Sequence, residues 1–364
     1  MARIAILTSP EGHASIAEAI SQALQSQHHV ESITIRDSLF KLYTPIYQFF
    51  PNAFQVPYKL SQQATFLAGF RKVMQRKLTP AVVRFLDKTK PDIVVCTHYF
   101  FLYALEPICK SRNIKLINII PDPWSIHPMT ISKSADANVV FDEKTLELCR
   151  AIEPEAHYEA FGWFVRQEFS QQSAESLKDL REKLKLNPKL PTILVAGGSE
   201  GTMMIMKLLP ALLQLKKPVQ AIVLCGSNVH LHRSVRMLSL VLRNVTQSRI
   251  IPVGFTADVA EYVAVADLVV GKAGPNTIFE AVAAGKPFFA ITHITGQEDG
   301  NLELIKHYHI GQVEEHPLKA VKTLRAMLLQ PKKLTQYSAG LELLAAYNRQ
   351  AKTKLINLCA SYAG

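Results

Sequence analysis

The residues best suited to do chemistry lie between Gly271 and Asn301, in a stretch that predicts a helix marked at both ends. Gly274 is the predicted N-cap and Pro275 the first helical position, where the missing N–H of proline costs nothing. Gly285 ends the predicted helix. The backbone N–H groups and the dipole at such a helix start attract an anion, and phosphate is its natural occupant.

The exposed face of this predicted helix is polar. Asn276, Thr277 and Glu280 share that face because residues three and four apart are neighbours on a helix. Glu280 lies more than one turn inside the helix, where its carboxylate suits the vicinal hydroxyls of a ribose. Three more polar side chains without positive charge follow a second glycine-containing turn and suit a neutral hexose: Gln297, Glu298 and Asn301. An ordinary crossover helix with a solvated polar face is the alternative, and periodicity alone does not separate the two.

The order of residues in this stretch resembles the donor-site signature of a known family. The matching pattern is Lys272-Ala273-Gly274-Pro275-x-Thr277-Ile278-x-Glu280-Ala281, then Gly285-x-Pro287, then Gly296-Gln297-Glu298-x-Gly300-Asn301. It is similar to that of the monogalactosyldiacylglycerol synthases and processive diacylglycerol glucosyltransferases of glycosyltransferase family 28, and more distantly to that of the N-acetylglucosaminyltransferase that makes lipid II. The family commonly has Gly at the position of Asn276. The resemblance implies that the listed polar residues, with Lys272, Gly274 and Pro275, bind a UDP-hexose.

Composition sets the limits of the fold. The chain has 364 residues, 48% of them hydrophobic, which is enough for two soluble domains with separate cores. No apolar run approaches the ~18 residues of a membrane span, and the first residues lack the features of a signal peptide. The five cysteines are scattered without CxxC spacing, so we expect reduced, mostly buried thiols.

The net charge of +11 predicts an anionic partner. An acidic lipid surface and a charged small substrate are both compatible with this charge. A nucleic acid is the weakest candidate, because no RNA-binding or DNA-binding module is visible.

The first domain begins with a predicted strand over Ile4–Thr8 and a helix over His13–Gln25. Between them, Gly12 and His13 match the end of the glycine run that the family carries here, although the preceding glycines are absent. An imidazole titrates near neutral pH, so His13 is a candidate general base for an attacking hydroxyl. The alternative is a histidine that only caps the helix.

A βαβ unit follows, with predicted strands over 92–96 and 115–120 and a helix over 99–111. The loop after its second strand belongs to the binding edge of a parallel sheet. In this loop Asp122, His127 and Pro128 match the family at its spacing. Asp122 either orients His13 or is itself the base, and an Asx turn beside proline is the alternative without a site.

Residues 39–90 combine aromatic and basic side chains. Aromatic rings near lysines suit the headgroup boundary of a bilayer, and an apolar face flanked by basic residues suits a helix on an anionic membrane. A solvated charged face on an ordinary core helix is the alternative. The resemblance favours the membrane, because family members are peripheral membrane enzymes. The predicted membrane and acceptor residues are Tyr47, Phe49, Phe50, Phe54, Arg71, Lys72, Arg76 and Lys77, with His127.

The βαβ pattern restarts with a predicted strand over 191–196, which is followed by the glycine-containing loop of Gly198 and Ser199. We expect this loop to let the backbone approach the sugar or the phosphates, and a simple tight turn is the alternative. Another predicted strand, over 249–253, ends at Gly254 and Phe255. The resemblance implies that this last loop binds uracil.

We therefore expect an α/β protein of the GT-B architecture, with two Rossmann-like domains whose parallel sheets face each other across a cleft. The predicted domains are residues 1–165 for the acceptor and the membrane and residues 191–335 for the nucleotide sugar. Residues 166–190 are the predicted linker, and residues 336–364 form a helix that returns to the first domain.

The expected activity is that of an inverting hexosyltransferase acting from UDP-hexose on the hydroxyl of diacylglycerol. The resemblance places it peripherally at the cytoplasmic face of a membrane, without a metal or cofactor and with possible activation by anionic lipid. Three alternatives stay open: a UDP-sugar 2-epimerase, a transferase to another lipid acceptor, and a non-catalytic membrane subunit that keeps the donor fold.

Overall fold

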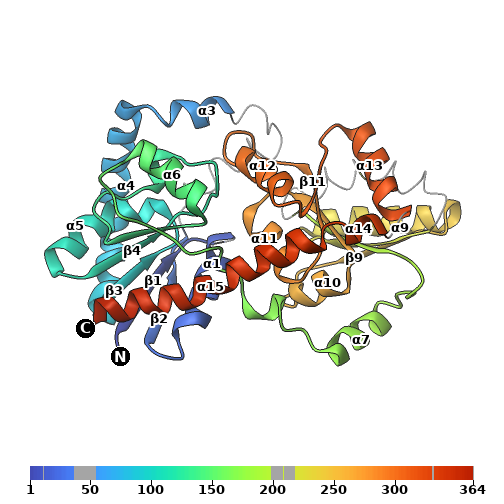
Figure 1. The fold of residues 1–364 in the computed structure, drawn as a ribbon, viewed down its shortest axis with the longest axis horizontal. Helices are drawn as coiled ribbons and strands as arrows, with labels where there is room; N and C mark the ends of the chain where they lie inside the picture. Colours follow the sequence, from blue (N-terminus) through green and yellow to red (C-terminus); the bar gives the residue numbers. More distant parts are fainter. Residues whose placement is uncertain (11, 37–54, 198–207, 209–217, 330–331, 364) are drawn as a thin grey trace. The chain divides into compact units, whose positions relative to one another are not determined.

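The computed structural model describes residues 1–363 except 11, 37–54, 198–207, 209–217 and 330–331. It contains two compact units. The first comprises Met1–Arg166, Ile294–Gly300 and Ala346–Gly364, and the second comprises Gln167–His293 and Asn301–Ala345. Each unit is built on its own six-stranded parallel sheet with helices packed against it (Figure 1). The predicted pair of Rossmann-like α/β folds is therefore confirmed.

The sheet of the first unit has the order β2-β1-β3-β4-β5-β6. Its strands are β1 (Arg3–Thr8), β2 (His29–Thr34), β3 (Ile93–Cys96), β4 (Lys115–Ile119), β5 (Ala137–Val140) and β6 (Tyr158–Ala160). Its helices are α1 (Gly12–Leu24), α3 (Gln55–Leu60), α4 (Ala64–Thr89), α5 (Leu102–Arg112) and α6 (Glu143–Ile152). The chain goes from β1 to β2 on one side and then to β3 on the other. The strand order thus reverses between β1 and β3, and such a reversal opens a crevice at the carboxyl ends of the strands.

The central strands of this sheet are buried on both faces, as expected where crossover helices cover a parallel sheet. All residues of β3 and β5 are buried, whereas the edge strand β2 alternates between exposed and half-buried positions. Helix α4 contributes Met74, Leu78, Val82, Phe85 and Leu86 to the core under β1, β3 and β4. These residues recur every three or four positions, the period of a helix with one apolar face.

The sheet of the second unit has the order β12-β11-β10-β7-β8-β9. Its strands are β7 (Thr192–Ala196), β8 (Gln220–Leu224), β9 (Arg249–Val253), β10 (Leu268–Lys272), β11 (Phe288–Thr292) and β12 (Gly311–Val313). Its helices are α7 (Ala174–Lys183), α9 (Val229–Val245), α10 (Val259–Val265), α11 (Pro275–Ala283), α12 (Asp299–His307), α13 (Pro317–Leu329) and α14 (Lys332–Thr335). This is the strand order of a dinucleotide-binding fold, with its reversal between β7 and β10.

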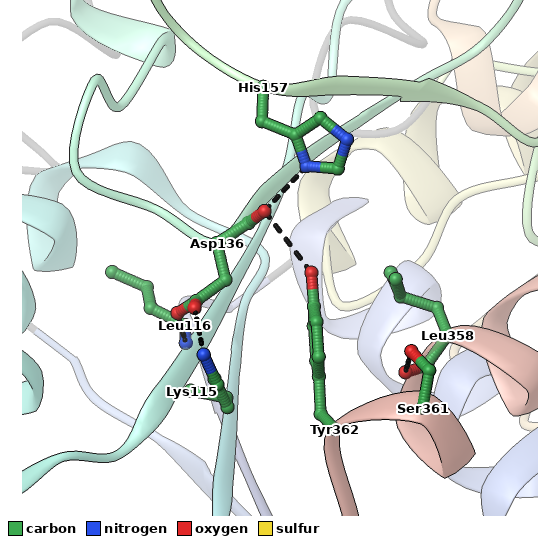
Figure 2. A network of polar contacts seen from close by, with 7 residues as sticks. All are labelled: Lys115, Leu116, Asp136, His157, Leu358, Ser361 and Tyr362. Atoms are coloured by element: carbon green, nitrogen blue, oxygen red, sulfur yellow. Dashed lines mark hydrogen bonds and ion pairs between the residues drawn. The ribbon is translucent and has the colours of Figure 1, made fainter.

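The last helix, α15 (Ser338–Ala363), begins in the second unit and ends in the first. Within the first unit, Lys354 Nζ donates to the carbonyl of Ala160 at 2.7 Å and Tyr347 donates to that of Phe141 at 3.2 Å. Figure 2 shows the end of this helix, where Tyr362 points at the backbone oxygen of Asp136, 3.1 Å away. The Nδ1 atom of His157 lies 2.6 Å from the same oxygen.

The carboxylate of Asp136 completes this network. It accepts from Lys115 Nζ at 2.7 Å and from the backbone N–H of Leu116 at 2.9 Å (Figure 2). The ammonium of Lys115 also lies 5.4 Å from the centre of the Tyr362 ring. Tyr362, in the last turn of α15, therefore contacts both the backbone before β5 and the side chain of Lys115 at the start of β4.

Three strands were not predicted from the sequence: β2, β6 and β12. They are short or partly exposed, so they lack a continuous apolar run. Among the described residues, no helix is both long enough and apolar enough to cross a membrane.

Candidate active site

His13 lies at the strand reversal of the first unit. It follows β1 at the start of α1, and Thr97 follows the neighbouring strand β3. The Nδ1 atom of His13 lies 2.7 Å from the carbonyl oxygen of Thr97. Because a carbonyl oxygen only accepts, Nδ1 carries the hydrogen and the lone pair stays on Nε2. The ring is therefore held in the tautomer that a general base needs.

The surroundings keep His13 neutral. Burial lowers the pKa of its imidazole to about 4, and the hydrogen bond to Thr97 offsets only part of this effect. A second histidine, His98, lies edge-on to this ring with the centroids 4.3 Å apart. Burial also lowers the pKa of His98 well below its usual value, and the neighbouring His13 adds to this effect. The two imidazoles form a pair that is uncharged at neutral pH.

Thr97 and His98 were missed in the sequence analysis. The hydroxyl of Thr97 donates to that of Thr8 at 2.8 Å, which ties the ends of β3 and β1 together. The Nδ1 of His98 accepts from the backbone N–H of Phe100 at 3.3 Å. A Thr-His pair directly after a buried strand was the available signal, because strand ends of a parallel sheet collect functional side chains.

Asp122 lies in the loop after β4, where it is 6% exposed. Its Oδ1 atom lies 3.4 Å from the side-chain amide nitrogen of Gln297, which belongs to the Ile294–Gly300 segment of the same unit. The same two loops meet again where the hydroxyl of Ser125 accepts from the backbone N–H of Gly300 at 2.7 Å. The predicted catalytic carboxylate is thus joined to a predicted donor-binding residue. The side chain of His13 makes its hydrogen bond to Thr97 rather than to Asp122.

His127 is buried and links the loop after β4 to the residue that follows α3. Its Nδ1 accepts from the backbone N–H of Met129, so Nε2 carries the hydrogen that reaches Ser61 Oγ at 2.9 Å. Ser61 in turn donates to the carbonyl of Tyr58 at 2.7 Å. Burial lowers the pKa of His127 to about 4. We predicted His127 as an acceptor or membrane residue, and the structure places it 6% exposed against the end of α3.

Tyr58 connects α3 to the loop after β11. Its ring packs edge-on to that of His127 at 5.0 Å. A side chain at Gly296, whose φ is +91°, would come within 2.8 Å of the same ring. Burial raises the pKa of Tyr58, and the carboxylates of Asp122 and Asp299 raise it further. Only glycine allows both the backbone conformation and the close approach of the ring.

Glu298, a predicted donor-binding residue, is 3% exposed. Its carboxylate turns back to accept from the backbone N–H of Ile294 at 2.7 Å. This contact shapes the turn that presents Gln297.

In the second unit, α11 begins as predicted, with Gly274 at the N-cap and Pro275 at the first position. Gly274 provides no side-chain cap for the helix. Lys272 ends β10 at a shift in its register with β11. Asn276, Thr277 and Glu280 are all half-buried. This helix start lies directly beside the strand reversal between β7 and β10.

Asn301 supports the loop before α11 from inside. Its side-chain nitrogen donates to the carbonyl of Ala273 at 2.8 Å, and the residue is 1% exposed. Its side-chain oxygen is buried without a hydrogen-bond partner. Asn301 was predicted to bind the donor, and its observed contact holds the backbone of Ala273, directly before Gly274.

Gly254 and Phe255 follow β9, at the same edge of the sheet as the start of α11. Three strand spacings separate β9 from β10, which is about 14 Å. The ring of Phe255 is 80% exposed. Gly254 is half-buried, and no atom lies within 4 Å of the position that a side chain would take there.

Six predicted site residues lie outside the described residues: Tyr47, Phe49, Phe50, Phe54, Gly198 and Ser199. No group of three or more His, Cys, Asp or Glu side chains that could hold a metal occurs in the described part of the chain.

The predicted membrane helix has two kinds of basic residue. Lys72, Arg76 and Lys77 are exposed. Arg71 is also exposed, but its guanidinium pairs with Glu106, a carboxylate that is 8% exposed and also accepts from Ser132 at 2.7 Å. The apolar positions of α4 divide as well, because Met74 is in the core whereas Phe66 and Val73 are 41% and 58% exposed.

Two family models match the chain. The model of monogalactosyldiacylglycerol (MGDG) synthase matches residues 13–156, and the model of the glycosyltransferase family 28 C-terminal domain matches residues 192–347. The first match begins at His13. The second contains α11 and the Gly254–Phe255 loop.

Curated relatives give the same result. A probable monogalactosyldiacylglycerol synthase 3, chloroplastic, of Oryza sativa subsp. japonica is 30% identical over 236 residues, which is 60% of this chain and 44% of the relative. The processive diacylglycerol beta-glucosyltransferase of Bacillus licheniformis is 26% identical over 271 residues, 72% of this chain and 67% of that protein. The chain spans about half the length of the first curated relatives that it matches.

Solved structures share the fold at low identity. MurG of Acinetobacter baumannii matches with a TM-score of 0.64 at 16% identity over 98% of both chains. Anabaena HepE, solved in complex with UDP-glucose, matches with a TM-score of 0.59 at 16% identity over 98% of this chain and 99% of its own. The predicted GT-B class is confirmed by these neighbours.

Proposed function

We propose that the chain, which belongs to the family of monogalactosyldiacylglycerol synthases and diacylglycerol glucosyltransferases, moves a hexose from a UDP-sugar to the hydroxyl of diacylglycerol. The observation that carries the proposal is the anchored imidazole of His13 at the strand reversal of the first unit. The names of the relatives supply the acceptor, and the UDP-glucose bound to a neighbour of the same fold supplies the class of donor.

In the proposed reaction, His13 Nε2 removes the proton of the acceptor hydroxyl. The hydroxyl oxygen forms a bond to the anomeric carbon as the bond between that carbon and the diphosphate oxygen breaks. UDP leaves, and the proton remains on the imidazole until solvent takes it. Attack from the face opposite to UDP inverts the anomeric carbon. A neutral imidazole suits this step because a protonated one has no lone pair to accept with.

The second unit is proposed to hold the donor. The start of α11 offers backbone N–H groups and the positive end of the helix dipole to the diphosphate, and this stabilises the negative charge on the leaving group. Glu280 is proposed to accept from the ribose hydroxyls, and the loop at Gly254 and Phe255 to hold uracil. No metal or cofactor takes part in this scheme.

The acceptor requires a membrane surface. The exposed Lys72, Arg76 and Lys77 of α4 are proposed to draw the enzyme to anionic lipid at the cytoplasmic face. Each such charge near an anionic bilayer contributes about 1 kcal/mol. Anionic lipid is therefore expected to raise the rate by concentrating the enzyme on its acceptor.

The test supplies liposomes of diacylglycerol and anionic lipid with UDP-galactose, UDP-glucose or UDP-N-acetylglucosamine in separate reactions. UDP release and lipid products are followed together. We expect a monoglycosyl lipid from one of these donors. If UDP binds and no lipid product forms, the acceptor is wrong. If the sugar isomerises without lipid, the chain is an epimerase instead.

Two variants separate the two halves of the proposed site. His13→Ala should lower the turnover about 10²-fold to 10⁴-fold, the usual contribution of a general base, with little change in UDP affinity. Glu280→Ala should weaken UDP binding instead. Full activity of His13→Ala would exclude His13 as the base, and unchanged UDP affinity of Glu280→Ala would remove the ribose assignment.

A further inference from the structure

Helix α9, yellow in Figure 1, carries apolar side chains on two opposite faces, one buried and one exposed. One face packs on the sheet, where Leu231, Val235, Ser239 and Leu242 are all buried. Ser239 donates to the carbonyl of Ile250 at 2.7 Å, which fixes this face against β9.

The other face of α9 is exposed and also apolar. Val229, Met237, Leu240 and Val241 are 57%, 64%, 52% and 58% exposed. The spacings of eight, three and one place them on the side of the helix that points away from the core. No other described helix exposes as many large apolar side chains. A gathering of this kind on one element marks an interaction surface.

The charged side chains of this helix have one sign. Arg233 and Arg236 lie among its apolar residues and are themselves exposed. The helix contains no Asp or Glu. The sequence from residue 201 to residue 257 has none of the chain's 30 acidic residues, although it carries seven of the 41 Lys and Arg residues. Such a bias in composition is what an anionic partner selects for.

We infer that the outer face of α9 binds an anionic lipid bilayer, as a membrane contact of the second unit in addition to the one proposed for α4. An interfacial helix combines a flexible aliphatic stripe with flanking cations and without carboxylates, and α9 has all of these. The arginine stems can lie along the apolar surface while their charged ends reach the lipid phosphates. The inference does not depend on which sugar is transferred.

A protein partner fits this face less well. Interface hot spots are rich in Trp and Tyr and poor in Leu and Val, and the exposed face of α9 combines Val, Met and Leu with His230 and two arginines. The absence of acidic residues along the helix also excludes the mixed charges that fix the register of two proteins.

The test uses the full chain and vesicles of phosphatidylcholine with or without 30% phosphatidylglycerol, in the absence of any UDP-sugar. Trp replaces Leu240 in one variant and Leu318 in the control, because Leu318 on α13 is 74% exposed in the same unit. Lipids brominated in their acyl chains quench a tryptophan that enters the bilayer. We expect strong quenching for Leu240→Trp and little additional quenching for Leu318→Trp.

Vesicle partitioning provides the second measurement. Met237→Glu combined with Leu240→Glu should lower the partition coefficient about tenfold or more on anionic vesicles, whereas Leu318→Glu should leave it within about twofold. Arg233→Gln with Arg236→Gln should also lower it about tenfold on anionic vesicles. Thermal melting of each variant verifies the fold.

Two results would overturn the inference. One is a Leu240→Trp variant that anionic vesicles leave unquenched. The other is a parent protein that self-associates in solution and becomes monomeric on Met237→Glu, because the face then belongs to a second copy of the chain. Since no sugar donor is present, neither result depends on the proposed transfer reaction, whose failure appears only in the assay of lipid products.

Discussion

His13 and Thr97 are 84 residues apart in the chain and 2.7 Å apart between Nδ1 and the carbonyl oxygen. The contact exists because β1 and β3 are neighbours in the sheet and both residues follow the carboxyl ends of these strands. It fixes the direction of the ring and its tautomer before any substrate binds. A base held in advance does not have to be ordered during the reaction.

The pH dependence of the reaction follows from this arrangement. Burial lowers the pKa of His13 to about 4, so the neutral form, which is the active one, persists above this value. The rate per bound enzyme should be nearly level from pH 6 to pH 8 and fall only as the pH decreases toward 4. Turnover at saturating donor and lipid measures it, with vesicle binding recorded at each pH. A rate that rises steeply between pH 6 and pH 7 would contradict the low pKa.

Asn301 should affect donor binding without touching the donor. Replacement by Ala leaves the Ala273 carbonyl without its buried partner, which costs about 1–3 kcal/mol and loosens the backbone at Gly274. We expect UDP to bind about tenfold more weakly, as measured by calorimetry. The matched control is Lys306→Ala, an exposed position on the same helix. Equal UDP affinities for the two variants would show that the loop does not need this contact.

Two glycine substitutions in the first unit should change the free energy of unfolding in opposite directions. Gly296→Ala brings a methyl group toward the Tyr58 ring and holds a non-glycine residue at φ +91°, so it should lower the free energy of unfolding by about 1–3 kcal/mol. Gly69→Ala lies within α4 in open space and should raise it by about 0.5–1 kcal/mol. Urea denaturation of both variants measures these free energies. A Gly296→Ala variant that is more stable than the parent would refute the packing of Tyr58 against Gly296.

Arg71 and Lys72 are adjacent on α4 and should behave differently. Arg71→Ala leaves the buried carboxylate of Glu106 without its cationic partner and should lower the free energy of unfolding by about 3 kcal/mol. Lys72→Ala should change stability by less than about 0.5 kcal/mol and weaken binding to anionic vesicles instead.

The double variant Arg71→Ala/Glu106→Gln checks the cause of this difference. It removes the buried charge together with its partner, so it should be more stable than Arg71→Ala alone. A double variant as unstable as the single one would assign the loss to packing of the arginine stem rather than to its charge.

The sequence was sufficient for the buried strands and for the start of α11. Continuous apolar runs predicted β1, β3 and β7, and the Gly-Pro pair predicted the first residue of α11. Strand β2 was not predicted because it has no continuous apolar run: Val30 and Ile33 are its only aliphatic residues. Helix α4 was predicted as an amphipathic basic helix, but the direction of its apolar residues depends on the sheet beneath it. Met74 therefore belongs to the core, while Val73 is exposed.

The candidate site was predictable in location but not in the direction of its side chains. His13 was identified by its place after the first strand, yet its partner Thr97 follows from a strand pairing that no local pattern contains. Glu298 and Asn301 have the composition of sugar ligands, and both turn inward to hold backbone groups. Spacing indicates which residues share a loop, whereas burial determines which of them face a ligand.

The way in which α15 completes the first unit has a consequence for biosynthesis. The sheet of this unit is translated before the second unit, but Asn348, Lys354 and Tyr362, which contact its strands and loops, are translated after it. Until then the backbone oxygens of Ala160 and Asp136 lack these partners. The first unit therefore lacks its contacts with α15 while the entire second unit is synthesised.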